Sequence, residues 1–272
     1  MTSPSSSTSS SSDYKTLLYE VRDGVAIVTM NNPRSRNAFD ADMRLELPDA
    51  VRRVARDDTV KAMIFTGAGG VFCGGGDIRD MHNTPRTAFQ SRERMHLLHE
   101  WLHLLINLEK PVVGAVDGPA FGGGFNLALA CDFILATPRA SFCQVFGRIG
   151  LVPDLSGLYL LPRIVGLQRA KELVFSTRVL GAEEARQLGI VFELHEPEVL
   201  QQAAFDLAQR FTTASTQALG LAKSILNRSH HLDLATVAEL ECHAQGLCMD
   251  SAYHKEALER FLKREKPLFN WG

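Results

Sequence analysis

The sequence predicts an α/β fold with a largely parallel sheet, followed by a helical C-terminal segment. Apolar strand-like runs alternate with helix-like runs as far as about residue 200, which is the pattern of strand–helix units. Two glycine-rich turns, at 72–78 and 119–126, each follow a strand-like run and lead into a helix-like run. Beyond residue 200 the chain is almost entirely helical in pattern, as far as Pro267.

The individual elements follow from local patterns. Residues 24–30 are β-rich and apolar, and Asn31-Asn32-Pro33 ends that strand. Asp40 is a candidate N-cap for a helix that continues to about residue 55. The remaining expected elements are strands at 60–66, 111–116 and 133–136, a helix at 85–108, and a helix from the second glycine turn to about residue 131.

Composition limits the classes of protein that fit. A chain of 272 residues with 45% hydrophobic and 22% charged residues is ordinary for a globular protein. A formal net charge of −2 argues against a general nucleic-acid-binding surface. No apolar run reaches the roughly 18 residues of a membrane span. The 5 cysteines form no CxxC pair, which favours a reducing, cytoplasmic location.

Serine dominates the N-terminus. Residues 1–12 lack the apolar segment and basic start of a secretory signal, so we expect a disordered tail there. The sequence thus divides into this tail, a core at 13–200 and a helical segment at 201–272.

The two glycine turns suggest a catalytic device. Gly122-Gly123-Gly124 opens a predicted helix, whose first N–H groups lack internal partners and can hold an anionic oxygen. Neither turn has the spacing of a phosphate-binding P-loop. A single turn of this kind could simply give the chain a tight bend. Two turns in equivalent settings favour an oxyanion hole, in which two backbone N–H groups hold one oxygen.

At this point the chain resembles the enoyl-CoA hydratase/isomerase family, also called the crotonase family, from residue 14 to residue 269. The segments that carry the resemblance are NPRSRNAF (32–39), FCGGGDI (72–78), PVVGAVDGPAFGGGFNLALACD (111–132), GLVPD (150–154) and LPRIVG (161–166). The resemblance implies a spiral of ββα units and a helical C-terminal oligomerisation segment. It also implies a homotrimer or a dimer of trimers that acts on an acyl-CoA thioester. CoA would then be part of the substrate, with no separate cofactor.

The resemblance also implies site residues. The N–H groups of Gly76 and Gly123 would form the oxyanion hole around the thioester carbonyl. The residues expected to contact CoA are Arg34, Arg36, Ala38, Phe261 and Arg264. The alternative for the arginines is a solvated surface charge, and for Phe261 it is ordinary helix packing.

Both positions at which the family's hydratases carry glutamate differ here. They hold Asn126 and Phe146, which with Phe121 would line the substrate pocket. Asn cannot transfer a proton as a carboxylate does, so ordinary hydration is disfavoured, although residual hydratase chemistry stays open. Asp154 stands where several isomerases of the family carry their base. Burial would have to raise its pKa, and the alternative role is a helix N-cap.

Other functions remain open. The family's 4-chlorobenzoyl-CoA dehalogenases use an aspartate at the position of Asp154 as nucleophile, with a histidine that aligns roughly with His99. Loss of both glutamates is also compatible with a non-catalytic CoA-binding protein. Retention of the glycine turns and of Asp154 favours an enzyme, and double-bond isomerisation fits the surviving groups best.

The sequence contains one match to a zinc-binding motif. Residues 99–103 read H-E-x-x-H, which on a helix would place His99 and His103 on one face. Catalytic zinc normally has a third protein ligand, and no suitable downstream histidine follows. We therefore expect no metal site.

Overall fold

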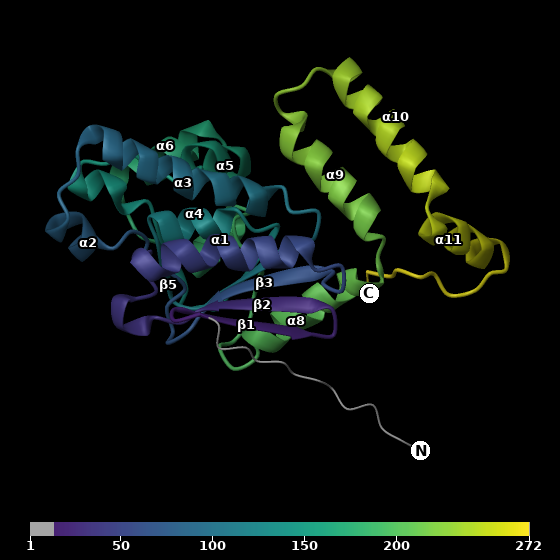
Figure 1. Ribbon diagram of the computed structural model, residues 1–272, viewed down its shortest axis with the longest axis horizontal. Helices are drawn as coiled ribbons and strands as arrows, with labels where there is room; N and C mark the ends of the chain where they lie inside the picture. Colours follow the sequence, from purple (N-terminus) through teal and green to yellow (C-terminus); the bar gives the residue numbers. More distant parts are fainter. Residues whose placement is uncertain (1–13, 272) are drawn as a thin grey trace.

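A six-stranded sheet forms the centre of the computed structural model, which describes residues 14–271 (Figure 1). The strand order is β1-β2-β3-β4-β6-β9; β1 pairs antiparallel with β2, and every other pair is parallel. These strands are β1 (Leu17–Arg22), β2 (Val25–Met30), β3 (Ala62–Gly67), β4 (Val112–Val116), β6 (Phe133–Ala136) and β9 (Glu193–Leu194). A small second sheet consists of β5 (Pro119–Phe121), β7 (Ser141–Cys143) and β8 (Leu180–Gly181).

Helices cover both faces of the main sheet, with α1 on one face and α8 on the other (Figure 1). The helices are α1 (Ala41–Arg56), α2 (Ile78–Asn83), α3 (Ala88–Ile106), α4 (Gly123–Leu129), α5 (Gly157–Val165), α6 (Leu167–Ser176), α7 (Ala182–Gln187), α8 (Leu200–Arg210), α9 (Thr216–Ser229), α10 (Leu234–Asp250) and α11 (Ala252–Leu262). Short 3-10 helices occur at Pro33–Ser35, Val145–Ile149 and Phe211–Thr213.

A hydrophobic core lies on each face of the main sheet, and β3 contributes side chains to both cores. Successive side chains of a strand point to opposite faces. In β3, Met63 and Phe65 join the large core under α1, α3 and α4, whereas Ile64 joins the smaller core under α8. All three are buried, which is why this central parallel strand appears in the sequence as a continuous apolar run.

Side-chain caps define where the helices begin. The Asp40 carboxylate accepts a 2.9 Å hydrogen bond from the Met43 N–H, which confirms the predicted start of α1. Asp77 caps α2, and Thr87 forms a capping box with Gln90 at the start of α3. The Thr87 capping box fixes the residue at which α3 begins after the end of α2.

The α/β fold class predicted from the sequence is confirmed. The strands at β2, β3, β4 and β6 and the helices α1, α3 and α4 all lie where expected, within a few residues. The sequence did not indicate β1, nor β5, β7, β8 and β9, four strands of only two or three residues. Such short strands contain too few residues to show a period-two pattern.

The C-terminal helices α9, α10 and α11 project from the body of the molecule (Figure 1). Neither α10 nor α11 buries a residue within the described chain. The last helix ends at Leu262, short of Pro267, and the chain then returns so that the Trp271 ring packs on Phe133 and Phe211. Division of the chain at residue 200 stays a prediction, and α8, just beyond it, packs on the main sheet.

Two further sequence predictions concern the N-terminal tail and membrane-spanning segments. The Ser-rich tail at 1–12 lies outside the described residues. Among the helices of residues 14–271, none has the length and apolar character needed to cross a membrane.

Candidate active site

The two glycine-rich turns lie side by side. Cys73 and Ala120 form a parallel bridge, and the Phe121 N–H donates a 2.9 Å hydrogen bond to the Cys73 carbonyl oxygen. The turns approach so closely that a Cβ atom on Gly75 would lie 3.1 Å from the backbone nitrogen of Gly123. The structure therefore brings together the two segments that the sequence singled out.

Gly76 and Gly123 present free backbone donors at this junction. Gly123 is the first residue of α4, where the N–H groups have no helical partner and the helix dipole is positive. Within residues 14–271, neither the Gly76 N–H nor the Gly123 N–H donates to a protein acceptor. Unpaired donors of this kind can hold a negatively charged oxygen.

Buried Asn37 supports the first turn. Its backbone is left-handed, with φ 54°, and its side-chain N–H groups donate to the carbonyl oxygens of Val71 at 2.7 Å and Ala68 at 3.0 Å. Next in the chain, the Phe39 N–H donates to the Gly75 carbonyl oxygen at 2.8 Å. Asn37 thus couples the NPRSRNAF segment to the first glycine turn, a role that the sequence pattern did not reveal.

Asp154 lies beside the second turn. Its Oδ1 is buried without a hydrogen-bond partner among the described residues, and it would lie 3.5 Å from a Cβ atom on Gly123. Burial raises the pKa of Asp154 to about 6, against smaller opposing effects of its own backbone N–H and the Arg94 guanidinium. Ser156, not Asp154, occupies the N-cap position of α5.

A buried amide pair fixes the backbone of Asp154. Asn126 donates from Nδ2 to the Asp154 carbonyl oxygen at 2.8 Å, while its Oδ1 accepts a 2.8 Å bond from Gln144. Leu155 and Ser156 then adopt left-handed conformations, with φ 44° and 59°. Such conformations in non-glycine residues cost of order 1 kcal/mol each and persist only where surrounding contacts hold them. Sequence reasoning missed Gln144, because its partner is distant in the chain.

Aromatic side chains flank the second turn. Phe146 is buried, and its ring edge would lie 3.6 Å from a Cβ atom on Gly122. Phe121 is half-buried at the end of β5. Leu151, three residues before Asp154, is exposed.

The predicted CoA-contacting residues fall into two groups. Arg34 and Arg36 are exposed, and the Arg36 carbonyl oxygen accepts a 2.8 Å bond from the Gly74 N–H of the first glycine turn. Ala38 is buried in the same segment. Phe261, 79% exposed on α11, and Arg264 just after it lie on the projecting segment, so one chain does not bring them to the glycine turns (Figure 1).

The H-E-x-x-H histidines are surface residues of α3. His99 is exposed, and burial of part of its ring lowers its pKa. His103 is also exposed and lies against Asn107. No cluster of three or more His, Cys, Asp or Glu side chains suited to a metal occurs in residues 14–271.

Comparisons with known proteins agree with this geometry. The model of the enoyl-CoA hydratase/isomerase family matches residues 20–271. Among solved structures, an enoyl-CoA hydratase/isomerase from Cupriavidus metallidurans CH34 is 41% identical, with a TM-score of 0.89, covering 95% of this chain and 97% of that one.

Relatives of known name differ in the reaction that they are named for. A 1,2-epoxyphenylacetyl-CoA isomerase of Escherichia coli is 35% identical, covering 93% of this chain and 97% of that protein. A 4-chlorobenzoyl coenzyme A dehalogenase of Arthrobacter is 34% identical, covering 94% of each. A crotonyl-CoA hydratase of Syntrophomonas wolfei is 35% identical, covering 94% and 98%. Whatever reaction it performs, this chain belongs to the enoyl-CoA hydratase/isomerase family of acyl-CoA enzymes.

Proposed function

We propose that the protein isomerises a double bond in an acyl-CoA thioester by way of an enolate. The N–H groups of Gly76 and Gly123 hold the thioester oxygen, and Asp154 moves the proton. The observation that carries this proposal is the position of Asp154 next to Gly123: its buried Oδ1 has no hydrogen-bond partner among the described residues, and burial raises its pKa to about 6. A base with a pKa near the working pH is suited to both removing and returning a proton.

The proposed isomerisation consists of two proton transfers with an enolate between them. Asp154 removes a proton from a carbon conjugated with the thioester, and the electron pair moves toward the carbonyl oxygen. The resulting enolate oxygen accepts hydrogen bonds from the two glycine N–H groups, each contributing roughly 3 kcal/mol to transition-state stabilisation. Asp154 then returns the proton to a different carbon, so the double bond has moved and the enzyme is unchanged.

Hydration is less well supported by the residues at the hole. Asn126 uses both ends of its amide in bonds to Asp154 and Gln144, and Phe146 offers no proton. Addition of water requires groups that position and activate it. Phe121 and Phe146 instead give the pocket an apolar wall.

Residues 32–39, next to the first glycine turn, are proposed to bind CoA. Exposed Arg34 and Arg36 are placed to contact phosphates, with Ala38 beside them. The reaction requires no cofactor besides the CoA of its substrate. The proposed location is the cytoplasm, which the 5 free cysteines favour.

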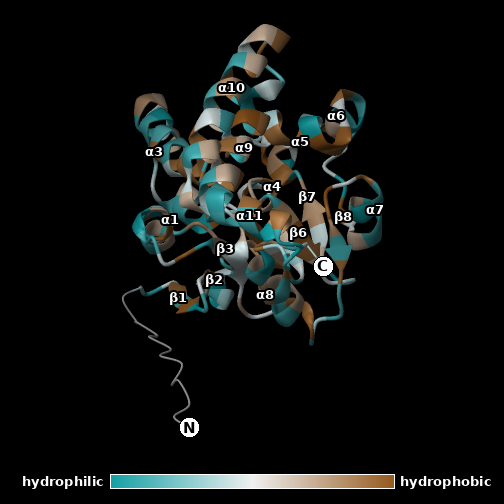
Figure 2. Cartoon of the chain, turned by 90° about the vertical axis from the view of Figure 1, so that its right-hand side faces the viewer, coloured by the Kyte–Doolittle hydropathy of each residue, from teal (hydrophilic) through white to brown (hydrophobic). Residues whose placement is uncertain are grey.

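We propose a homotrimer or a dimer of trimers, in which Phe261 and Arg264 contact the substrate of a neighbouring subunit. The projecting α9–α11 segment supports this, and apolar residues recur along α10 among hydrophilic ones (Figure 2). The large hydrophobic side chains exposed on α10 and α11 are Leu234, Leu247, Met249, Leu258, Phe261 and Leu262.

The test is a panel of enoyl-CoA thioesters supplied to wild type, to Asp154→Asn and to a control, Asp206→Asn, at an aspartate on α8. The assay follows double-bond migration and uptake of solvent deuterium. We expect loss of both in Asp154→Asn and wild-type rates in the control. If Asp154→Asn isomerises as fast as wild type, the proposed base is wrong.

A dehalogenase is the second candidate. The Asp154 Oδ1, which has no hydrogen-bond partner among the described residues, could attack an aromatic carbon as nucleophile, and the Arthrobacter relative is named a dehalogenase. Chloride release from 4-chlorobenzoyl-CoA, without isomerisation of any enoyl-CoA, would favour this reaction instead. Absence of acyl-CoA binding altogether would favour a non-catalytic role.

A further inference from the structure

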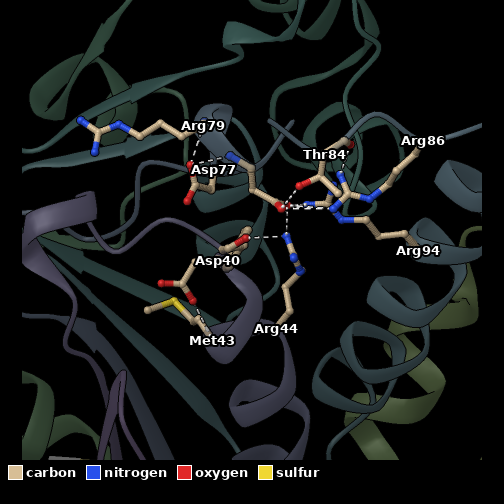
Figure 3. Close-up of polar contacts among 10 residues, drawn as sticks. Asp40, Met43, Arg44, Asp77, Arg79, Thr84, Arg86 and Arg94 are labelled. Atoms are coloured by element: carbon tan, nitrogen blue, oxygen red, sulfur yellow. Dashed lines mark hydrogen bonds and ion pairs between the residues drawn. The ribbon is translucent and has the colours of Figure 1, made fainter. Parts of the chain in front are cut away.

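Three arginines converge on one carboxylate next to the candidate active site. Arg44 of α1, Arg86 before α3 and Arg94 of α3 converge in Figure 3, and each forms an ion pair with Asp80 of α2. Their nitrogens lie 3.1, 3.1 and 3.3 Å from the Asp80 oxygens. Helices α1, α2 and α3 thus meet at a single ionic cluster, called here the arginine cluster.

The arginine cluster has too little negative charge. Its side chains are only 15 to 21% exposed, so water screens them weakly. One carboxylate neutralises one guanidinium and leaves an excess of two positive charges. The other acceptors are neutral: Arg44 donates to the Phe39 carbonyl oxygen and Arg86 to that of Thr84.

The excess charge acts most strongly on Arg94. Burial lowers its pKa, and repulsion from Arg44 and Arg86 lowers it further, against the attraction of Asp80 and Asp154. Its Nε is buried and has no hydrogen-bond partner among the described residues. A buried donor without an acceptor destabilises a folded protein. A second anion beside Arg94 would reduce the repulsion among the three guanidinium groups.

The cluster is close to the proposed chemistry. Arg44 donates a 2.9 Å hydrogen bond to the carbonyl oxygen of Phe39, whose ring lies 2.9 Å from the position of a Cβ atom on Gly123. The charge of Arg94 is close enough to Asp154 to oppose the rise in its pKa. The arginine cluster therefore adjoins both the Phe39 side of the proposed oxyanion hole and the proposed base.

Room for a ligand exists beside the guanidinium groups. A cavity of about 340 Å³ between α1 and α3 is bordered by Arg44 and Arg94, and its wall is otherwise mostly apolar. The other lining residues are Ala41, Leu45, Pro48, Arg52, Leu97, Leu98 and Glu100.

We propose that Arg44, Arg86 and Arg94 bind a carboxylate at the distal end of the acyl group. The substrate class would then be a CoA thioester of a dicarboxylic acid. This inference rests on the proposed function and adds the identity of the acyl group. Arginine forks match carboxylates with paired, charge-assisted hydrogen bonds. The phosphates of CoA have separate candidate partners in Arg34 and Arg36, so the missing anion is assigned to the acyl group.

The test measures equilibrium binding of saturated thioesters, which cannot isomerise. Calorimetry compares succinyl-, glutaryl-, adipoyl- and pimeloyl-CoA with the monocarboxylic thioesters of the same chain lengths. For the best-fitting length we expect binding at least about tenfold tighter with the carboxylate than without it, as for a charge-assisted hydrogen bond. This comparison needs only the wild-type protein.

Variants then locate the effect. Arg86→Gln and Arg94→Gln should each remove the preference for the carboxylate, while binding of the monocarboxylic thioester stays near wild type. Arg92→Gln is the matched control, because Arg92 lies on the same helix but is exposed and outside the cluster. Thermal unfolding of each variant checks that it is folded.

Four results would overturn the inference. Equal binding of both thioester series by wild type refutes it and leaves the proposed function intact. A preference that survives in Arg86→Gln and Arg94→Gln places the carboxylate elsewhere. Equal weakening of free CoA and of all thioesters in those variants assigns the anion to a CoA phosphate. Failure of every thioester to bind refutes the proposed function as well.

Discussion

Asn126 donates its side-chain N–H to the backbone carbonyl oxygen of Asp154 at a distance of 2.8 Å. The residue at a position where hydratases of the family carry glutamate therefore holds the backbone of the proposed base. Gly157 makes this possible, because a Cβ atom there would collide with the Asn126 amide.

The first prediction concerns Gly157. Gly157→Ala should displace the Asn126 amide, shift Asp154 and lower kcat by about tenfold or more. It should also lower the melting temperature, because the displaced polar groups are buried. Gly246→Ala is the control, since nothing lies within 4 Å of the added methyl group on α10. Equal activity of the two variants would show that the Asn126 contact does not position the base.

The second prediction concerns pH and catalysis. Asp154 must be ionised to remove a proton, so kcat/KM should rise with pH and level off above a midpoint of about 6. A pH–rate profile of the accepted thioester checks this. A midpoint near 4, the value of an exposed carboxyl, would show that burial does not tune Asp154.

The third prediction concerns pH and stability. The pKa of Asp154 is raised in the folded state to about 6, so the folded protein binds more protons than the unfolded chain between roughly pH 4 and pH 6. The contribution of Asp154 to stability therefore falls as pH rises through that window. At pH 7 we expect Asp154→Asn to be more stable than wild type by about 1–3 kcal/mol. Chemical unfolding at pH 4 and pH 7 measures it, and the gain should be nearly absent at pH 4.

The fourth prediction separates two neighbouring glycines. Gly75 has φ 88°, and a Cβ atom there would lie 2.6 Å from the Phe121 carbonyl oxygen and 3.1 Å from the Gly123 nitrogen. At Gly76 the obstacle is only the flexible end of Met81. Gly75→Ala should therefore lower kcat by about a hundredfold, as for a lost oxyanion donor, and Gly76→Ala much less. The reverse order would contradict the proposed geometry of the hole.

The fifth prediction concerns CoA. Replacing Arg34 and Arg36 together by alanine should weaken binding of CoA by about tenfold or more, through loss of phosphate contacts. Binding by wild type should weaken with added salt, and the double variant should show a smaller salt dependence. Arg79→Ala, an exposed arginine on α2, serves as the control. An unchanged affinity in the double variant would mean that these arginines are surface charges only.

The fold could be predicted to a large extent from the sequence, because its main elements leave local signals. Asp40 marks the start of α1, and residues 62–67 form an unbroken apolar strand. The shortest strands, β8 and β9, depend on pairing with distant strands and have no local signal. Their formation is decided by tertiary contacts.

The candidate site could be predicted in its components but not in its arrangement. Glycine turns and Asp154 are visible as motifs, because backbone N–H groups and a carboxylate have roles tied to residue type. The hydrogen bonds from Gln144 to Asn126 and from Asn126 to Asp154 join residues that the topology alone brings into contact. The arginine cluster likewise joins three helices around Asp80, and no spacing pattern in the sequence predicts it.

The sequence by itself determined the α/β class, the membership in an acyl-CoA enzyme family and the presence of two glycine turns and one carboxylate. Only the tertiary structure decided that the turns lie side by side, that Asp154 is buried enough to titrate near pH 6, and that excess positive charge gathers beside it. The physical reason is that motifs and periodicity are properties of neighbouring residues. Desolvation and charge excess are properties of the whole packed environment, to which residues far apart in the chain contribute.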